Sequence, residues 1–116
     1  MKKKSIKKVI CFDIDGVICE TKSGNYKKSK PIKKAIEVIN KLYKKNKIIL
    51  FTARYMGRSK GVSSIAEKRA KKLTINQLSK WNVNYHHIIF AKPSYDLIID
   101  DKALGFKKTW YKNFKF

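Results

Sequence analysis

Two carboxylates at alternate positions, Asp13 and Asp15, stand where a short apolar run gives way to Gly16. The run that precedes them is typical of a buried strand, so both acids belong to its carboxyl end, where open α/β sheets bind their ligands. Neighbouring carboxylates repel each other unless a cation joins them. Because Asp and Gly are also common turn residues, the pair alone is consistent with either a turn or a cation site.

Two further strand ends carry side chains that could do chemistry. Thr52 follows one apolar run, and the pair Asp100 and Asp101 follows another, with Lys92 shortly before that second run. In a sheet of parallel strands these ends lie along one edge. Several carboxylates, a hydroxyl and an ammonium would then share one crevice, and a set of oxygen ligands suits Mg²⁺ better than zinc.

The elements that must position these groups alternate along the chain. Apolar runs predict strands, and apolar residues at spacings of three and four predict helices, the second opened by a capping box of Ser64 and Glu67. In chain order the predicted elements are a strand over 7–13, a helix over 32–46, a strand over 48–51, a helix over 64–81, and strands over 88–90 and 97–99. This order predicts a doubly wound, Rossmann-like parallel α/β sheet. The connection between the last two predicted strands is short, so these strands can be parallel only if that connection is nearly extended.

Size and composition favour one domain over residues 1–116 in the cytoplasm. The chain has 116 residues and two cysteines, one of them inside the first predicted strand, so a disulfide framework is disfavoured. No apolar stretch reaches membrane-spanning length, and the N-terminus does not resemble a signal peptide.

The net charge of +21 has two readings. Lysine supplies nearly all of it, which favours compositional bias with solvated lysine faces; a polyanionic partner such as nucleic acid is the alternative. Arginine, the better residue for recognising phosphates and bases, is scarce. For the aromatic, basic tail over 106–116, burial against the sheet or a subunit contact is favoured over base stacking.

The chain carries four motifs in order, namely Asp13 with Asp15, then Thr52, then Lys92, then Asp100 with Asp101. These motifs resemble those of the haloacid dehalogenase superfamily of aspartate-nucleophile phosphatases, and they span about residues 7–105. The resemblance implies that Asp13 attacks phosphorus and becomes an aspartyl phosphate, while Asp15 serves as general acid and then base. It implies that Lys92 neutralises charge and that Thr52 and nearby backbone amides, such as that of Ala53, hold the phosphoryl oxygens. The implied Mg²⁺ ligands are Asp13, the backbone carbonyl of Asp15, Asp100 and Asp101.

The intervals between the motifs leave no room for the cap that commonly closes over the substrate in this superfamily. Around Thr52 and the final acidic pair, the chain is similar to small capless phosphatases of bacterial surface-polysaccharide, or capsule, biosynthesis. This similarity favours a sugar phosphate or small alcohol phosphate as substrate, with Arg54 and Arg58 as candidates to bind its anionic groups. An open cleft also leaves specificity to its loops, to a second subunit of a homo-oligomer or to a large substrate.

Two other functions remain open from the sequence. A nucleic-acid end phosphatase would use the lysines to hold a strand, and it predicts lysines around the crevice with Trp110 or Tyr111 exposed. A non-catalytic binding or assembly subunit is disfavoured, because no catalytic position is replaced. Transfer of the phosphoryl group to an acceptor other than water is compatible with the same motifs.

Overall fold

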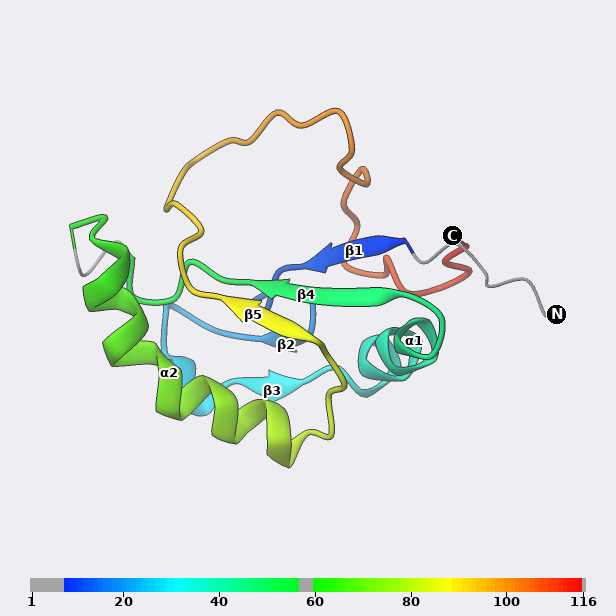
Figure 1. Ribbon diagram of the computed structural model, residues 1–116, viewed down its shortest axis with the longest axis horizontal. Coiled ribbons are helices and arrows are strands. Elements are labelled where there is room, and N and C mark those ends of the chain that lie inside the picture. The colour runs from blue at the N-terminus through cyan, green and yellow to red at the C-terminus, as the bar shows by residue number, and fades with distance from the viewer. Residues whose placement is uncertain (1–7, 57–59, 116) are drawn as a thin grey trace, which may run out of the picture.

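A computed structural model describes residues 8–56 and 60–115, and its centre is a three-stranded parallel sheet in the order β1-β4-β5 (Figure 1). The strands are β1 (Val9–Phe12), β4 (Lys47–Phe51) and β5 (His87–Ile89). In register, Cys11 pairs with Ile49 and Leu50 pairs with Ile88. The parallel strands are joined through helices, so the protein has an α/β architecture, as the sequence predicts at this level.

The two helices, α1 (Lys33–Tyr43) and α2 (Ser63–Lys80), contribute to one core on one face of the sheet. Side chains of β4 alternate between buried and half-buried, as expected for a strand covered on one side. The core joins both helices to the sheet through Ala35, Ile36, Ile39, Ile48, Leu50 and Leu78. Figure 1 shows α1 and α2 below the sheet. A second helical layer, as a doubly wound sheet requires, is absent from the described part of the chain.

Both predicted helix starts are shifted. Residues before α1 form β3 (Lys30–Pro31), which pairs antiparallel with β2 (Cys19–Glu20), and the helix begins one residue after the predicted start at 32. Helix α2 is preceded by Val62, with no side-chain cap. The predicted capping box of Ser64 and Glu67 is therefore wrong, because Ser64 is the second residue of the helix and not its N-cap.

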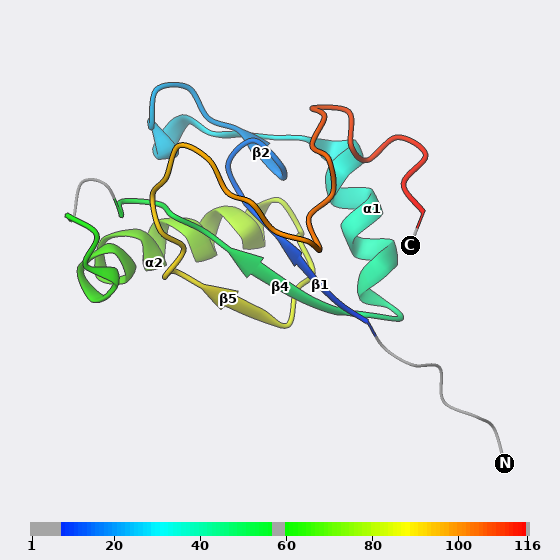
Figure 2. The ribbon, with the colours of Figure 1, turned by 90° about the horizontal axis from the view of Figure 1, so that it is seen from above.

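The predicted fourth strand does not form. Residues 91–100 contain no strand, and Leu97 and Ile99 are 77% and 91% exposed. This segment arches over the face of the sheet that the helices leave uncovered (Figures 1 and 2). To become a parallel neighbour of β1 it would have to cross β4 and β1, three strand spacings or about 14 Å, and also return along a strand. At about 3.5 Å per residue, the segment between β5 and residue 97 is barely long enough for that path.

The aromatic tail is anchored on the core. Trp110 is 7% exposed, and its ring packs at a tilt against that of Phe12 in β1, with the ring centres 5.4 Å apart. Its indole N–H donates to the Val17 carbonyl at 3.2 Å. Tyr111 and Phe114 pack partly against the same cluster. The prediction that the tail is buried against the sheet is confirmed for Trp110. Among the residues that the structure describes, no helix is long and apolar enough to cross a bilayer.

Candidate functional site

At the carboxyl end of β1, Asp13 forms an ion pair with Lys92, which lies just after β5. Lys92 Nζ is 3.1 Å from Asp13 Oδ2, and the side chains of Lys92 and Asp13 are 13% and 34% exposed. Burial raises the pKa of the Asp13 carboxyl, although the Lys92 charge and a hydrogen bond from the Ile14 N–H oppose the rise. Burial also works against the charge on Lys92, but the Asp13 carboxylate and Tyr95 together outweigh it and raise the pKa of Lys92. The structure thus joins two predicted catalytic groups.

Asp15 lies in the turn that follows and is held by a second cation. Arg54 donates from Nε to Asp15 Oδ2 at 3.0 Å and from Nη2 to Asp15 Oδ1 at 2.9 Å. The Thr21 hydroxyl donates to the same Oδ1 at 2.5 Å. Gly16, with φ of +87°, lets the chain reverse so that Cys19 bridges back to Asp15 and Thr21 comes within reach. The sequence pattern predicts the two acids, but it does not predict their separate cations.

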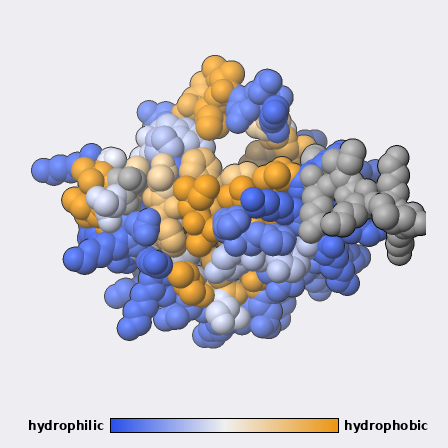
Figure 3. Space-filling model, in the orientation of Figure 1, coloured by the Kyte–Doolittle hydropathy of each residue, from blue (hydrophilic) through white to orange (hydrophobic). Residues whose placement is uncertain are grey.

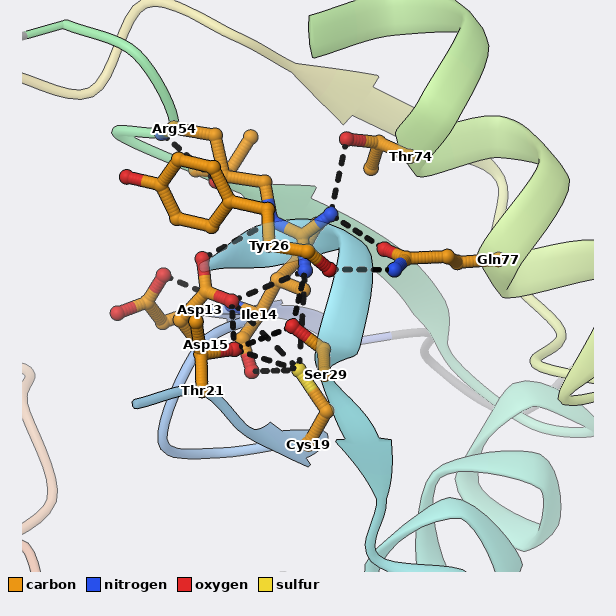
Figure 4. Close-up of polar contacts among 11 residues, drawn as sticks. Asp13, Ile14, Asp15, Cys19, Thr21, Tyr26, Ser29, Arg54, Thr74 and Gln77 are labelled. Carbon is orange, nitrogen blue, oxygen red and sulfur yellow. Dashed lines mark hydrogen bonds and ion pairs between the residues drawn. The ribbon is translucent and has the colours of Figure 1, made fainter. Parts of the chain in front are cut away.

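Arg54 is 1% exposed and has no access to a substrate in this structure. Figure 4 shows its guanidinium enclosed by the segment around Asp15 on one side and by α2 on the other. Its Nη1 donates to Thr74 Oγ1 at 3.1 Å and to Gln77 Oε1 at 2.6 Å, and its carbon Cζ lies 5.0 Å from the centre of the Tyr26 ring. The prediction that Arg54 binds substrate anions is therefore wrong for this arrangement. Arg58, the other candidate, lies outside the described residues.

Thr52 is fully buried just beyond the end of β4. Its Oγ1 accepts the Arg54 backbone N–H at 3.1 Å, and its carbonyl accepts the Lys92 N–H at 3.3 Å. Within the described ranges, no group accepts the Thr52 hydroxyl proton and no hydrogen bond is formed by the Ala53 N–H. Two donors therefore remain unused where β4 ends.

The other predicted acids are not gathered at this site. Asp100 and Asp101 are exposed on the arching segment, where Asp100 Oδ1 accepts the Lys102 N–H at 2.9 Å in a local turn. Across residues 8–56 and 60–115, no three His, Cys, Asp or Glu side chains come together as a metal site would require. The Asp13 carboxylate is paired with the Lys92 ammonium instead. As they stand, the predicted ligands do not fit Mg²⁺, which needs several oxygen ligands in near-octahedral geometry.

Several side chains that the sequence analysis overlooked complete the site. Thr21, Ser29, Thr74 and Gln77 are ordinary polar residues in the sequence, yet all of them contact the Asp15–Arg54 pair or one of its partners. Thr74 and Gln77 are three residues apart in α2, the spacing that places both on one side of a helix. Thr74 falls among the inward-facing positions of α2, and a polar residue at such a position indicates a buried polar partner.

Comparison with protein-family models gives no match, and neither does comparison with curated proteins. Among solved structures, the chain is similar to the crystal structure of a protein from Vibrio cholerae described only as an MCSG target. The TM-score is 0.83 at 22% sequence identity, over 93% of this chain and 89% of that one. At this level of identity the likeness supports the α/β fold alone, so the chemistry of the site has to be argued from its own residues.

Proposed function

We propose that this protein is a phosphatase of the haloacid dehalogenase type, which hydrolyses a phosphate monoester through an aspartyl phosphate on Asp13. The observation that carries the proposal is the 3.1 Å ion pair between Asp13 and Lys92, which lies next to a second carboxylate, that of Asp15. A carboxylate is a weak nucleophile, and a phosphate monoester is itself negatively charged. A fixed ammonium beside the attacking oxygens offsets that repulsion as the new bond forms.

Each group has a defined task in the proposed reaction. Asp13 attacks phosphorus, the bond to the leaving oxygen breaks, and Asp15 gives that oxygen a proton. Asp15 then takes a proton from the water that hydrolyses the aspartyl phosphate. The Ala53 N–H, an unused donor on a half-buried residue at the end of the neighbouring strand, is suited to bind a phosphoryl oxygen. The Thr52 hydroxyl is also an unused donor, but it is fully buried and would reach a phosphoryl oxygen only if the end of β4 opened.

The proposal also includes a fourth strand and Mg²⁺. The outer edge of β1 has no strand partner among the described residues, and the apolar side chains of residues 97–99 are exposed (Figure 3). If these residues paired with that edge, they would be covered, and Asp100 and Asp101 would reach the end of β1. The sheet would then have the four parallel strands that the resemblance implies, with both helices still on one face. Burial of the apolar side chains would offset the cost of stretching the join.

A small substrate, a sugar phosphate or alcohol phosphate, remains our choice over a nucleic-acid end. The aromatic residue best suited to stack a base, Trp110, is 7% exposed and already packed on Phe12. Trp110 therefore does not offer the exposed platform that the nucleic-acid hypothesis predicts. We place the enzyme in the cytoplasm, with its open cleft completed by the substrate or by a second subunit.

The test is release of phosphate from p-nitrophenyl phosphate with added Mg²⁺, comparing the wild type with Asp13→Asn. The substitution keeps the shape of the side chain but removes the nucleophile, so activity should fall to background. Asp96→Asn, the same change at an exposed acid outside the site, is the control and should keep wild-type activity. Full activity in a folded Asp13→Asn protein would overturn the assignment of the nucleophile.

Two further measurements separate the parts of the proposal. EDTA should abolish activity, and Mg²⁺ should slow amide hydrogen exchange at residues 97–101; unchanged exchange would reject the docked fourth strand. A panel of sugar phosphates, alcohol phosphates, nucleotides and end-phosphorylated oligonucleotides identifies the substrate class. A preference for oligonucleotides that weakens steeply with salt would favour the nucleic-acid hypothesis. No hydrolysis of any ester by the wild type would favour a binding subunit.

A further inference from the structure

Arg54 contributes the most heavily engaged side chain of the site, although it lies beneath the surface. Its guanidinium donates to two oxygens of one carboxylate, to one hydroxyl and to one amide oxygen, all within 3.1 Å. A buried arginine without partners would be strongly destabilising, so its burial depends on these hydrogen bonds. The fork of a guanidinium also matches a carboxylate in a single orientation, which a lysine cannot do.

The contacts of Asp15 show which of its oxygens is still available. A carboxylate has about four lone-pair positions, two on each oxygen. Oδ1 accepts from the Thr21 hydroxyl at 2.5 Å and from Arg54 Nη2 at 2.9 Å, with a weaker contact from the Cys19 thiol at 3.6 Å. Among the residues that the structure describes, Oδ2 accepts only the Arg54 Nε bond, at 3.0 Å. One acceptor position is therefore left on Asp15, and it is on Oδ2.

The far side of the guanidinium is fixed to α2. Thr74 Oγ1 and Gln77 Oε1 receive the two Nη1 bonds, and Gln77 Nε2 in turn donates to the Tyr26 carbonyl at 2.6 Å. Thr74 is fully buried. The helix thus holds the arginine in place, and the arginine holds the carboxylate. Since both ends of this connection are hydrogen-bonded, the orientation of Asp15 is set before any substrate arrives.

We propose that Arg54 is a positioning residue for proton transfer, holding Asp15 so that Oδ2 is the oxygen that gives and takes the proton. This inference rests on the proposed phosphatase function, in which Asp15 is the general acid and base. It replaces the role of Arg54 as a substrate ligand with an indirect one. A substrate ligand would alter KM when removed, whereas a positioning residue alters kcat.

Kinetics of Arg54→Ala and Arg54→Lys test the inference. A misplaced catalytic group costs about 10²-fold, so kcat should fall by about that factor in both variants, with KM within about twofold of the wild type. Free guanidinium ion, added below denaturing concentrations, should occupy the vacated site and raise the kcat of Arg54→Ala at least about tenfold. Arg69→Ala, the same change on the exposed side of α2, should keep wild-type kcat and show no rescue.

A double variant tests whether Arg54 acts through Asp15. Adding Arg54→Ala to Asp15→Asn should lower kcat no further, because the group that Arg54 positions is already lost. If the two losses multiply, or if KM rises while kcat is unchanged, the positioning role is rejected. Should Arg54→Ala fail to fold, Thr74→Val removes one anchor without changing side-chain volume. It should lower kcat about three- to tenfold at unchanged KM, and unchanged kcat would count against the inference.

The ion pair can also be tested without any turnover. In the wild type, the Arg54 Nε–H should give a resonance protected from solvent exchange in NMR spectra, and Asp15→Ala should abolish the protection. An unprotected Arg54 Nε–H in the wild type would refute the positioning role whatever the activity. A protected resonance in a protein that hydrolyses no phosphate ester would instead reject the phosphatase proposal and leave the pair as a structural one.

Discussion

Replacing Lys92 with methionine removes one charge from the site and keeps most of the apolar stem. Lys92 Nζ and Asp13 Oδ2 are 3.1 Å apart. At that distance two unit charges attract by about 1.3 kcal/mol in bulk water and by about 5 kcal/mol at an effective dielectric constant of about 20. Because the Asp13 side chain is 34% exposed, solvent screens the attraction between the two charges. We therefore take this attraction as about 2 kcal/mol, near the value for bulk water. At about 1.4 kcal/mol for each factor of ten, Lys92→Met should lower kcat about 30-fold.

The same substitution should change the pH dependence in a known direction. Asp13 must be ionised to attack phosphorus, so its pKa sets the acidic limb of kcat/KM. Burial raises that pKa above its ordinary value of 3.8, and the Lys92 charge pulls it down. Without the ammonium, the pKa of Asp13 rises further, and the acidic limb moves to higher pH.

The assay is the initial rate of p-nitrophenyl phosphate hydrolysis across the acidic and neutral range, for the wild type and for Lys92→Met. Lys72→Met, at an exposed position of α2, is the matched control and should leave both the rate and the limb unchanged. An acidic limb that stays in place or moves to lower pH would refute the electrostatic argument. A rate loss of equal size in the control would show that net charge, and not the pair with Asp13, is responsible.

Three further predictions concern stability, each measured as the free energy of unfolding in urea against the wild type. Trp110→Ala should cost about 3–5 kcal/mol, because the ring is 7% exposed and packs on Phe12; a loss below about 1 kcal/mol would mean that the tail is not anchored. Gly16→Ala should cost about 1–2 kcal/mol through backbone strain alone, since φ is +87° and an added Cβ meets nothing within 4 Å; no loss would mean the turn adopts another conformation. Without added Mg²⁺, Ile99→Ser should change stability by less than about 0.5 kcal/mol, because the side chain is 91% exposed, and a loss above about 2 kcal/mol would show that it is packed.

The elements that the sequence predicts well are those whose patterns are local. The strands over β1, β4 and β5 and both helices follow from apolar runs and helical spacing, with ends that differ by a few residues. Their ends were harder to predict because neither helix has a side-chain cap. The run at residues 97–99 shows the limit of such patterns. Its composition suits a strand, but pairing depends on whether the preceding join can reach a free edge, which residue types do not reveal.

The site shows the same division between local and distant information. Asp13 and Asp15 could be predicted because a strand and a turn place them within three residues of each other in the chain. Arg54 was visible as a rare arginine after a buried strand, but its partners are 39 residues away at Asp15 and 20 residues away at Thr74. Whether a polar side chain points outward to a substrate or inward to a carboxylate is decided by packing, so the sequence alone assigned it the wrong partner.

The anchoring of Trp110 has a consequence for the order in which the molecule folds. Its hydrogen bond to the Val17 carbonyl joins residues 93 positions apart, and its ring covers Phe12, the residue before Asp13. Contacts at such separation form late, because the chain between them must first be brought into place. During synthesis, the strand that bears Asp13 emerges long before the side chain that seals it. Until then its apolar face is open to water, to chaperones and to other nascent chains.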